Sequence, residues 1–479
     1  MKYFTVIFAL LIFAYTHKVK AQIDPARGLY NYGHSCTSVH KNANCDEARQ
    51  LPQFYVYRNA TVHISYFPPN ATDAADAKRS CSGTLIFQQF DGGDMEFYVL
   101  SAAHCQVYPD DKVSETDILF TFNFQYPVCN TTPQISPQLK AMVNPYIRAT
   151  RGATIVARGN WRKAEDYAED YILYKLKKDL SPIIFRDDIA VCFGCIHPYQ
   201  TPDELPTQAF SFHHPKGDVK KFSLDEDFSL SPINRDFTKP YYQVQSEIGV
   251  YQNGSSGCAL FGYDTNTERT CIIGILSAGS LSKEEEEKCD AETLKSQTLK
   301  FVRINNEFLQ SSRLGDFIPT AITTENELAA DNLCFARGTS CFNGGEPDGD
   351  ETSTDCGGNC PPCEEHCYSG RKDGNEDGVD CGGDCLPCHC FNGKTDADET
   401  RTDCGGKDCP PCRPPVGIGD GETCQILTTA PKIIVNNVPR RVTFRHHPPL
   451  TTRFNQVADR FPDFPKIVFA FPFEDFKPD

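Results

Sequence analysis

The sequence predicts an all-β domain over residues 22–320, followed by disulfide-rich repeats over residues 334–412 and a small β-rich tail over residues 425–479. The β prediction rests on many short runs rich in Val, Ile, Phe, Tyr and Thr, separated by Gly, Pro, Asn and Asp. Helical periodicity is scarce, with one candidate helix around residues 299–311. This pattern indicates barrels or sandwiches. A rise in cysteine density marks a boundary near residues 310–335.

The predicted strands are runs whose β-branched and aromatic side chains suit a pleated, half-buried surface. In the first domain they cover residues 54–67, 83–90, 96–103, 118–126, 154–158, 171–176, 209–214 and 271–279. In the tail, residues 432–438 and 466–473 are also strand-like. The tail is long enough for a few strands but not for a large core of its own.

Residues 1–21 have the pattern of a secretory signal peptide. Lys2 precedes the apolar run FTVIFALLIFAY, and the small residue Ala21 suits cleavage before Gln22. The alternative is a membrane anchor, but the apolar run is shorter than the about 20 residues that a span needs. No later run is apolar for long enough to cross a bilayer. We therefore expect a secreted, extracellular protein.

The cysteines and the charge agree with export. The chain has 24 cysteines, ten between Cys36 and Cys289 and fourteen between Cys334 and Cys424, and an oxidising compartment lets thiols pair. Net charge is −17, and residues 341–412 hold 17 Asp and Glu against 5 Lys and Arg. An acidic surface disfavours nucleic acid and anionic membranes as partners. The oligomeric state is left open.

Two local motifs carry chemistry. The first is LSAAHC, with His104, and the second is GSSGC, with Ser256 between Ser255 and Gly257. A serine hydroxyl becomes a strong nucleophile when an imidazole takes its proton and a carboxylate orients that imidazole. The glycines allow a tight turn, so that the amides of Gly254 and Ser256 can point at an oxyanion.

Asp170 is the candidate orienter, because it opens the strand-like run DYILYKL and so places a carboxylate at the edge of a buried strand. The order His104, Asp170, Ser256 is one of the known triad orders. Alone, GxSG occurs by chance and His104 suits a buried core position. Together, in an exported all-β chain, they predict a catalytic triad that needs no cofactor.

Residues from Cys36 to about Phe308 resemble the lysyl endopeptidase branch of the chymotrypsin-like serine proteases. The resemblance lies in CTSVHKNANC, CSGTLI, FYVLSAAHC, FNFQYPVC, EDYILYKL, FHHPKGDVKKFS and GVYQNGSSGCALF. It implies a double β-barrel and hydrolysis of peptide bonds in protein or peptide substrates.

The resemblance also implies disulfide pairs. Cys36 would pair with Cys289, Cys45 with Cys129, and Cys81 with Cys105. Cys258 and Cys271 are candidates for a staple across the hairpin after the nucleophile. Cys192 and Cys195 suit a tight CxxC bridge, with a redox motif as the alternative.

The chain departs from pancreatic-type proteases in one informative way. Those enzymes carry an aspartate before the nucleophile, which captures a newly cut N-terminus, whereas this chain has Ser255. We therefore expect the fold to be active without an N-terminal salt bridge.

The specificity residues match the resembled family less well. A lysine-binding site needs a buried carboxylate, but Ser296 stands near the position where the family has an acid. Asp290 and Glu292 are possible substitutes, and residues 284–287 are expected to form a solvated loop. Ser277 stands where the family has a histidine. The tryptophan that stacks on substrate has no evident counterpart, since the only tryptophan is Trp161. Lysine preference and a broader preference both stay open.

Three acidic repeats follow, each with four cysteines, over residues 341–363, 367–388 and 390–412. Alternating carboxylates can wrap Ca²⁺, and the alternative is a solvated acidic turn in a disulfide-stapled module. Zinc is less favoured, because cysteines of an exported chain tend to pair. The candidate Ca²⁺ ligands are Asp348, Asp350, Asp355, Asp373, Asn375, Asp380, Asp396, Asp398 and Asp403. The string resembles Cys-rich repeats of extracellular proteins that serve as stalks or binding modules.

Two functions compete on this reading. The first is a secreted serine endopeptidase. The second is an inactive protease-like protein that binds or adheres through its Cys-rich repeats. Sequons begin at Asn59, Asn70, Asn130 and Asn253, so a glycoprotein is expected if the source glycosylates.

Overall fold

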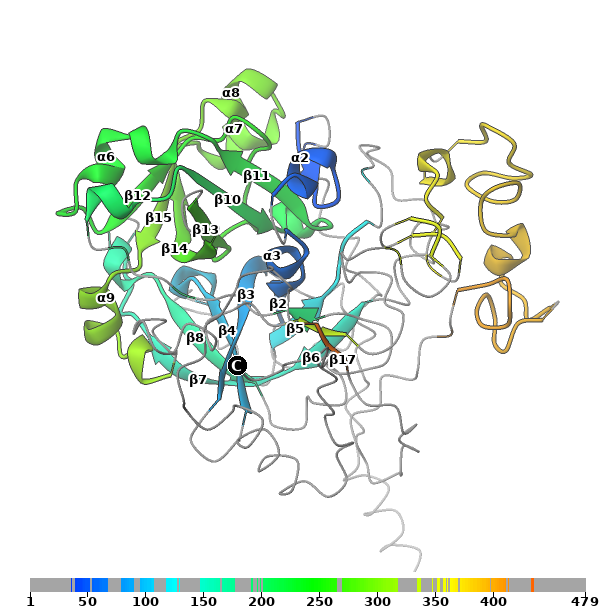
Figure 1. Ribbon diagram of the computed structural model, residues 1–479, viewed down its shortest axis with the longest axis horizontal. Helices are drawn as coiled ribbons and strands as arrows, with labels where there is room; N and C mark the ends of the chain where they lie inside the picture. The colour runs from blue at the N-terminus through cyan, green and yellow to red at the C-terminus, as the bar shows by residue number, and fades with distance from the viewer. Residues whose placement is uncertain are drawn as a thin grey trace, which may run out of the picture.

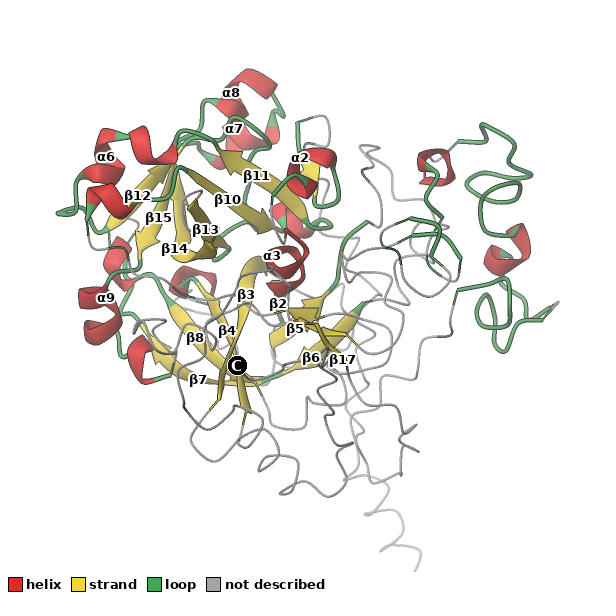
Figure 2. Ribbon diagram, in the orientation of Figure 1, coloured by secondary structure: helices red, strands yellow, loops and turns green. Residues whose placement is uncertain are grey.

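The computed structural model is dominated by two seven-stranded antiparallel sheets, with most of the helices at their periphery (Figure 2). Its described residues are 39–51, 54–67, 79–89, 95–106, 118–126, 147–163, 166–176, 191–192, 201–264, 269–317, 334–336, 351–353, 356–358, 362–368, 371–396, 398–410 and 432–434, with the single positions 36, 129, 196, 199, 347, 360 and 412. The predicted signal peptide and the second tail strand lie outside these residues. Among them, no helix is both long and apolar enough to cross a membrane.

The first sheet curls into a barrel. In spatial order its strands are β6 (Arg148–Arg151), β5 (Ile118–Phe122), β2 (Thr61–Tyr66), β3 (Arg79–Gln89), β4 (Met95–Ser101), β8 (Ile172–Leu176) and β7 (Ala153–Arg158). Edge strands β6 and β7 are separated only by Gly152, whose φ of 81° is a conformation that glycine adopts without strain. One bent segment therefore pairs with both ends of the sheet and closes it.

The second sheet closes in a similar way. Its strands, in spatial order, are β1 (Lys41–Asn42), β11 (Lys221–Asp225), β10 (Gln208–His213), β13 (Ala259–Asp264), β14 (Arg269–Gly279), β15 (Leu299–Arg303) and β12 (Tyr241–Val244). The chain beyond β12 returns to β11, where Ile248 bridges Leu224. The two closed sheets lie one above the other (Figure 1), which confirms the all-β, double-barrel prediction.

The helices are short. Among the described residues, the α-helices are α2 (Asp46–Arg49), α3 (Phe54–Ala60), α6 (Pro232–Arg235), α7 (Lys283–Glu287), α8 (Ala291–Lys295) and α9 (Asn306–Ser311). Helix α3 lies where the two sheets meet (Figure 1), and all seven of its residues are buried. The strand prediction for residues 54–60 was therefore wrong. The apolar run is a helix buried between two sheets, a choice that its composition alone does not reveal.

The helix expected around residues 299–311 was wrong in its first half. Residues Leu299–Arg303 form β15, which pairs with both β14 and β12. Asn305 then caps α9 by accepting a hydrogen bond from the Phe308 N–H at 2.7 Å. A strand with neighbours on both sides makes ladder hydrogen bonds that a helix at this place would forgo.

The residues after the second barrel add a small sheet and a set of disulfide-bonded turns. Strand β16 (Cys334–Ala336) pairs antiparallel with β9 (Val191–Cys192) on one side and with β17 (Lys432–Ile434) on the other. The first predicted tail strand is therefore present as β17, the edge strand of a small three-stranded sheet. In the second repeat Cys367 pairs with Cys385 and Cys381 with Cys388. In the third repeat Cys390 pairs with Cys409 and Cys404 with Cys412. Both repeats thus join their first cysteine to their third and their second to their fourth.

The second repeat also shares a hydrophobic cluster with residues from both barrels. Cys367 and Cys385 are buried together with Phe124, Tyr126 and Val219. Burial of this apolar surface stabilises contact between the two parts of the chain. In the described part of the chain, the second repeat therefore packs against the double-barrel domain.

Candidate active site

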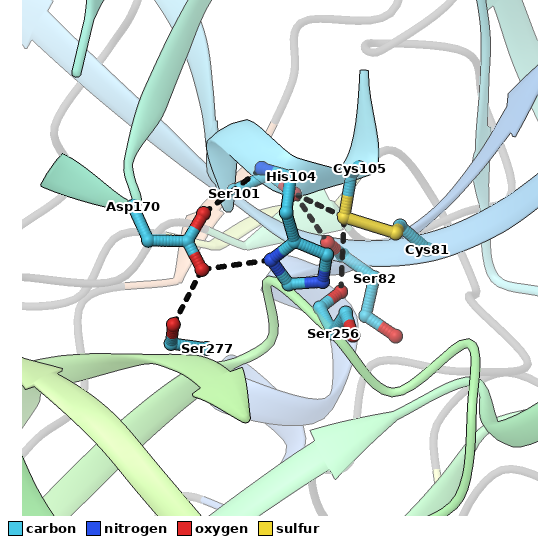
Figure 3. Close-up of polar contacts among 8 residues, drawn as sticks. All are labelled: Cys81, Ser82, Ser101, His104, Cys105, Asp170, Ser256 and Ser277. Atoms are coloured by element: carbon cyan, nitrogen blue, oxygen red, sulfur yellow. Dashed lines mark hydrogen bonds and ion pairs between the residues drawn. A yellow bond between two sulfur atoms is a disulfide. The ribbon is translucent and has the colours of Figure 1, made fainter. Parts of the chain in front are cut away.

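The candidate histidine and aspartate come from the first barrel. His104 lies in a short 3-10 turn, Ala103–Cys105, directly after β4. Asp170 directly follows the 3-10 turn Tyr167–Glu169 and comes just before β8. Because β4 and β8 are paired neighbours, with Ser101 opposite Ile172, their ends bring the two side chains together. The disulfide between Cys81 and Cys105 ties the turn of His104 to β3, as Figure 3 shows.

Asp170 is fully buried and accepts three hydrogen bonds. Its Oδ1 accepts from the His104 backbone N–H at 2.9 Å, and its Oδ2 accepts from His104 Nδ1 at 2.7 Å. The third comes from Ser277 Oγ to Oδ2 at 2.5 Å. A buried carboxylate is costly unless it is paired and hydrogen-bonded. These three donors offset the cost and fix which nitrogen of His104 faces the acid.

Ser277, which sequence reasoning treated only as a departure from the family, holds Asp170 from the second barrel. The register of β14 against β15 shifts between Leu276 and Ala278, so Ser277 lies at a β-bulge. Bulges re-aim a side chain, and this one allows the Ser277 hydroxyl to reach the carboxylate across the two barrels. The contact between Ser277 and Asp170 depends on this bulge, which cannot be recognised from the sequence.

Ser256 lies on the side of the His104 ring opposite Asp170 (Figure 3). It precedes β13, and its backbone O accepts a hydrogen bond from the Ser82 N–H at 2.8 Å. The Ser82 hydroxyl donates to the Gly254 carbonyl at 3.0 Å. Ser82 belongs to β3, so the first barrel holds the loop that carries Ser256. The N–H groups of Gly254 and Ser256 make no hydrogen bond within the described residues.

The glycines of GSSG are required by their surroundings. Gly254 has a φ of 98°, and a Cβ there would lie 2.8 Å from the His214 carbonyl oxygen. Gly257 has a φ of 81°, and a Cβ there would lie 2.1 Å from Ser101 Oγ. An alanine at either position is both strained and obstructed. The motif therefore encodes the conformation of this loop.

Trp161 stands beside the candidate triad. Its ring centroid lies 5.6 Å from that of His104, with 47° between the planes. Sequence reasoning found no counterpart for the tryptophan of the resembled family. The structure nevertheless brings the only tryptophan of the chain next to His104, a contact that depends on the fold.

The residues considered for a specificity acid do not lie in a buried site. Asp290 is exposed and caps α8, accepting from the Thr293 N–H at 2.8 Å. Glu292 and Ser296 are exposed as well. The solvated-loop prediction for residues 284–287 was wrong, since these residues lie in helix α7 and Glu286 is only 6% exposed. Residue 286 points inward because α7 places one face of its turn against the barrel.

The sequence analysis missed two buried polar side chains near the loop that carries Ser256. Glu286 Oε2 accepts a hydrogen bond from the Asn253 N–H at 2.8 Å, and burial raises the pKa of this carboxyl. Gln297 is 3% exposed, and its Nε2 lies 2.4 Å from where a Cβ on Gly279 would be. Gly279 lies two residues beyond Ser277. Glu286 and Gln297 thus bring polar groups to Asn253 and Gly279 from elements that are distant in sequence.

Of the five disulfides predicted for the first domain, three are confirmed: Cys36–Cys289, Cys45–Cys129 and Cys81–Cys105. The predicted Cys192–Cys195 bridge involves Cys195, which lies outside the described residues. The predicted Cys258–Cys271 bridge was wrong, because Cys258 is a free, buried thiol while Cys271 is bonded elsewhere. Cys271 lies opposite Gly262 in the β13–β14 ladder. Four residues of strand, about 13 Å, separate that point from Cys258, and a disulfide requires Cα atoms within about 7 Å.

The described aspartates of the repeats do not gather into an oxygen cage. Asp403 accepts from the Gly393 N–H at 2.8 Å, and Asp398 accepts from the Lys407 N–H. Asp396 accepts from the Asn392 side chain at 2.8 Å. Asp373, Asn375 and Asp380 belong to the matching turn of the second repeat, while Asp348, Asp350 and Asp355 lie outside the described residues. These contacts fit the alternative of a turn stabilised by carboxylates.

The described groups of potential metal ligands are of another kind. His366, Cys367, Glu376 and Cys385 lie together, as do His389, Cys390, Glu399 and Cys409. In each group the two cysteines are joined in a disulfide and offer no thiolate. A histidine with one carboxylate does not match the oxygen ligands that Ca²⁺ prefers.

One sequon is inaccessible. Asn59 is fully buried in α3, and its Oδ1 accepts a hydrogen bond from Arg58 Nε at 3.0 Å. Asn253 is exposed, and Asn70 and Asn130 lie outside the described residues. A glycan cannot be accommodated at Asn59 in the folded protein.

Comparison with known proteins identifies the family. One solved structure, a thermostable serine protease AL20 from an extremophilic microorganism, shares 10% identity with the chain; the alignment has a TM-score of 0.32 and covers 54% of this chain and 97% of the other. No curated protein matches the chain. The model of the lysyl endopeptidase C-terminal domain matches residues 33–293. That range is more than half of the 479 residues, and the protein therefore belongs to the lysyl endopeptidase family of serine proteases.

Proposed function

We propose that the protein is a secreted endopeptidase that cleaves peptide bonds by acylation of Ser256. The observation that carries this proposal is the pair of hydrogen bonds, 2.9 and 2.7 Å long, between buried Asp170 and the backbone and ring of His104. They leave the far ring nitrogen, on the side of Ser256 (Figure 3), to take the serine proton.

In the proposed mechanism His104 removes the hydroxyl proton of Ser256 as Oγ attacks the substrate carbonyl. The N–H groups of Gly254 and Ser256 then donate to the oxyanion. His104 returns the proton to the leaving amine, and the same steps with water release the acyl group. The carboxylate of Asp170 stabilises the imidazolium that forms on His104. Secretion is supported by the disulfides, which form and persist in oxidising compartments.

A fluorophosphonate probe tests the proposal. We expect the wild type to be labelled on Ser256, Ser256→Ala to be unlabelled, and the exposed control Ser296→Ala to be labelled like the wild type. An unlabelled wild type would overturn the proposal and favour an inactive binding protein. Profiling the labelled enzyme on a peptide library then identifies the side chain accepted before the cleaved bond, lysine or a broader set.

A further inference from the structure

Ser255, the residue before the proposed nucleophile, is an anchor of the loop Gln252–Ser256, which we name the oxyanion loop. Its side chain is fully buried. Its Oγ accepts a hydrogen bond from the Gln252 N–H at 3.3 Å, across the base of the loop. The same Oγ lies 2.8 Å from His213 Nδ1. The loop is thus fastened through the position where pancreatic-type proteases carry an aspartate.

His213 is held rigidly at the end of β10. The side chain is fully buried, and its Nε2 lies 3.0 Å from Ser223 Oγ on β11. The ring stacks on Tyr251, with centroids 4.5 Å apart and 15° between the planes. The hydrogen bond to β11 and the stacking on Tyr251 hold the imidazole in one orientation. The ring therefore fixes the position of Ser255 relative to the second barrel.

The hydrogen-bond directions follow from the donors available. A backbone N–H can only donate, so Ser255 Oγ accepts from Gln252. The Ser255 proton finds an acceptor in this network when it is donated to His213 Nδ1, and we infer that direction. His213 then carries its proton on Nε2 and donates to Ser223, whose hydroxyl is left to donate to the Val250 carbonyl at 3.5 Å. Every donor in this chain finds an acceptor when His213 is neutral.

The surroundings favour that neutral form. Burial, followed by the nearby His40 and Lys221, holds the pKa of His213 well below its ordinary value. A cationic His213 would donate from both nitrogens and leave the Ser255 proton without an acceptor in the chain just described. The network therefore works as a neutral relay of hydrogen bonds, unlike an ion pair with an N-terminal amine.

The other end of the oxyanion loop is anchored as well. Gln252 Oε1 accepts from the Cys36 N–H at 2.9 Å and from His40 Nε2 at 2.8 Å. Gln252 Nε2 donates to the Glu286 carbonyl at 3.0 Å. The N-terminal segment thus engages the loop through the peptide N–H of Cys36, and this contact requires no free N-terminal amine.

We propose that His213 is a positioning residue that holds Ser255 and so aims the N–H groups of Gly254 and Ser256 at the oxyanion. This inference rests on the proposed function. It gives the segment FHHPKGDVKKFS, which contains His213, a role in positioning the site, although His213 acts through Ser255 and not on Ser256 directly. It also explains how the loop keeps its shape with a serine at position 255.

Four forms of the full secreted chain test it: wild type, His213→Phe, Ser255→Ala and the double variant. His213→Phe keeps a ring to stack on Tyr251 but loses both hydrogen bonds. The measurements are the rate and half-saturation constants of fluorophosphonate labelling per folded molecule, and hydrogen exchange of the amides in residues 252–256. Tyr98→Phe and Ser65→Ala are the controls, since both are buried side chains of the first barrel whose hydrogen bonds go to Glu96 and His63, outside the oxyanion loop.

We expect each single variant to lower the labelling rate constant about 10- to 100-fold, with the half-saturation constant within about twofold. The double variant should be no worse than either single one, because both lose the same interaction. Amide exchange in the oxyanion loop should rise, and the controls should keep the wild-type rate constant. Folded His213→Phe and Ser255→Ala with wild-type rate constants would overturn the inference while leaving the proposed function intact. An unlabelled wild type would overturn both.

Discussion

At the scale of single residues, Asp170 shows how one carboxylate organises the site. It is fully buried, and each of its hydrogen bonds involves a group of the site: the His104 backbone, the His104 ring and Ser277. Because the first two come from one residue, the acid fixes both the position and the tautomer of the imidazole. Ser277 adds a donor from the other barrel, so a small shift between the barrels would lengthen the hydrogen bond between Ser277 and Asp170.

This arrangement predicts unequal effects of two substitutions. Asp170→Asn should lower kcat about 10⁴-fold, because an amide next to Nδ1 favours the wrong tautomer. Ser277→Ala should cost about tenfold or less, since the carboxylate keeps its two bonds to His104. Peptide-substrate kinetics check both values, with the exposed neighbour Glu169→Gln as the control. Asp170→Asn that retains a tenth of the wild-type kcat would contradict the assigned role.

At the scale of elements, strand register decides cysteine chemistry. Cys258 lies next to Leu276 rather than Cys271, because the Leu276 N–H donates to the Cys258 carbonyl at 2.9 Å. Burial raises the pKa of its thiol well above the ordinary value. A buried thiol that is protonated is a poor nucleophile.

We therefore expect iodoacetamide to alkylate Cys258 only after the chain is unfolded in denaturant without reductant. Peptide mapping by mass spectrometry locates the label, and Cys258→Ala should lose it without altering the Cys81–Cys105 bridge. Rapid alkylation of Cys258 in the native protein, or a peptide that links it to Cys271, would show that the register is different.

A second element-scale feature is the carboxylate staple of the repeats. Glu376 Oε2 accepts from the Asp373 and Asp380 N–H groups at 3.3 and 3.0 Å. Glu399 does the same for Asp396 and Asp403 at 3.4 and 3.0 Å. The acidic string thus encodes one repeated hydrogen-bonded turn, with the glutamate at its centre.

Glu376→Ala leaves two backbone N–H groups without their acceptor, and we expect it to destabilise the second repeat by about 1–3 kcal/mol. Glu376→Gln keeps a side-chain oxygen and should lose less. Amide hydrogen exchange at Asp373 and Asp380 is the measurement. If Ala and Gln variants exchange alike, the carboxylate oxygen is not the staple.

At the scale of the whole molecule, buried histidines make stability depend on pH. His40, His63, His213 and His214 are almost fully buried. Burial lowers the pKa of His63 to about 3 and that of His40 to about 4. Between these values and the ordinary value near 6.5, the unfolded chain binds protons that the folded chain does not. Stability from these groups is therefore present above pH 6.5 and is lost as the pH falls.

Replacing His63 by Phe isolates one such group. Between pH 6 and pH 4 the free energy of unfolding of the wild type should fall faster than that of His63→Phe, by about 1.4 kcal/mol per pH unit. Asp225, whose pKa burial raises to about 7, acts in the opposite direction but equally in both proteins. Urea unfolding followed by Trp161 fluorescence measures the difference, and parallel curves would contradict it.

The sequence by itself determined the strand-rich character of the chain and the residues of the candidate triad. Runs rich in β-branched and aromatic residues identify β4, β5 and β14, because such side chains suit a strand. LSAAHC and GSSG identify His104 and Ser256, since a glycine-flanked serine encodes its own turn. Three of the disulfides in the first domain followed from resemblance to a family.

Only the tertiary structure decided the contacts between elements that are distant in sequence. Helix α3 is helical because both sheets bury it. Glu286 points inward and accepts a hydrogen bond from Asn253. The register of β13 against β14 places Cys271 opposite Gly262, too far from Cys258 for a disulfide. His213 meets Ser255 across 42 positions of the chain. Each of these depends on how two elements pack, and local composition carries no information about a partner that only folding brings near.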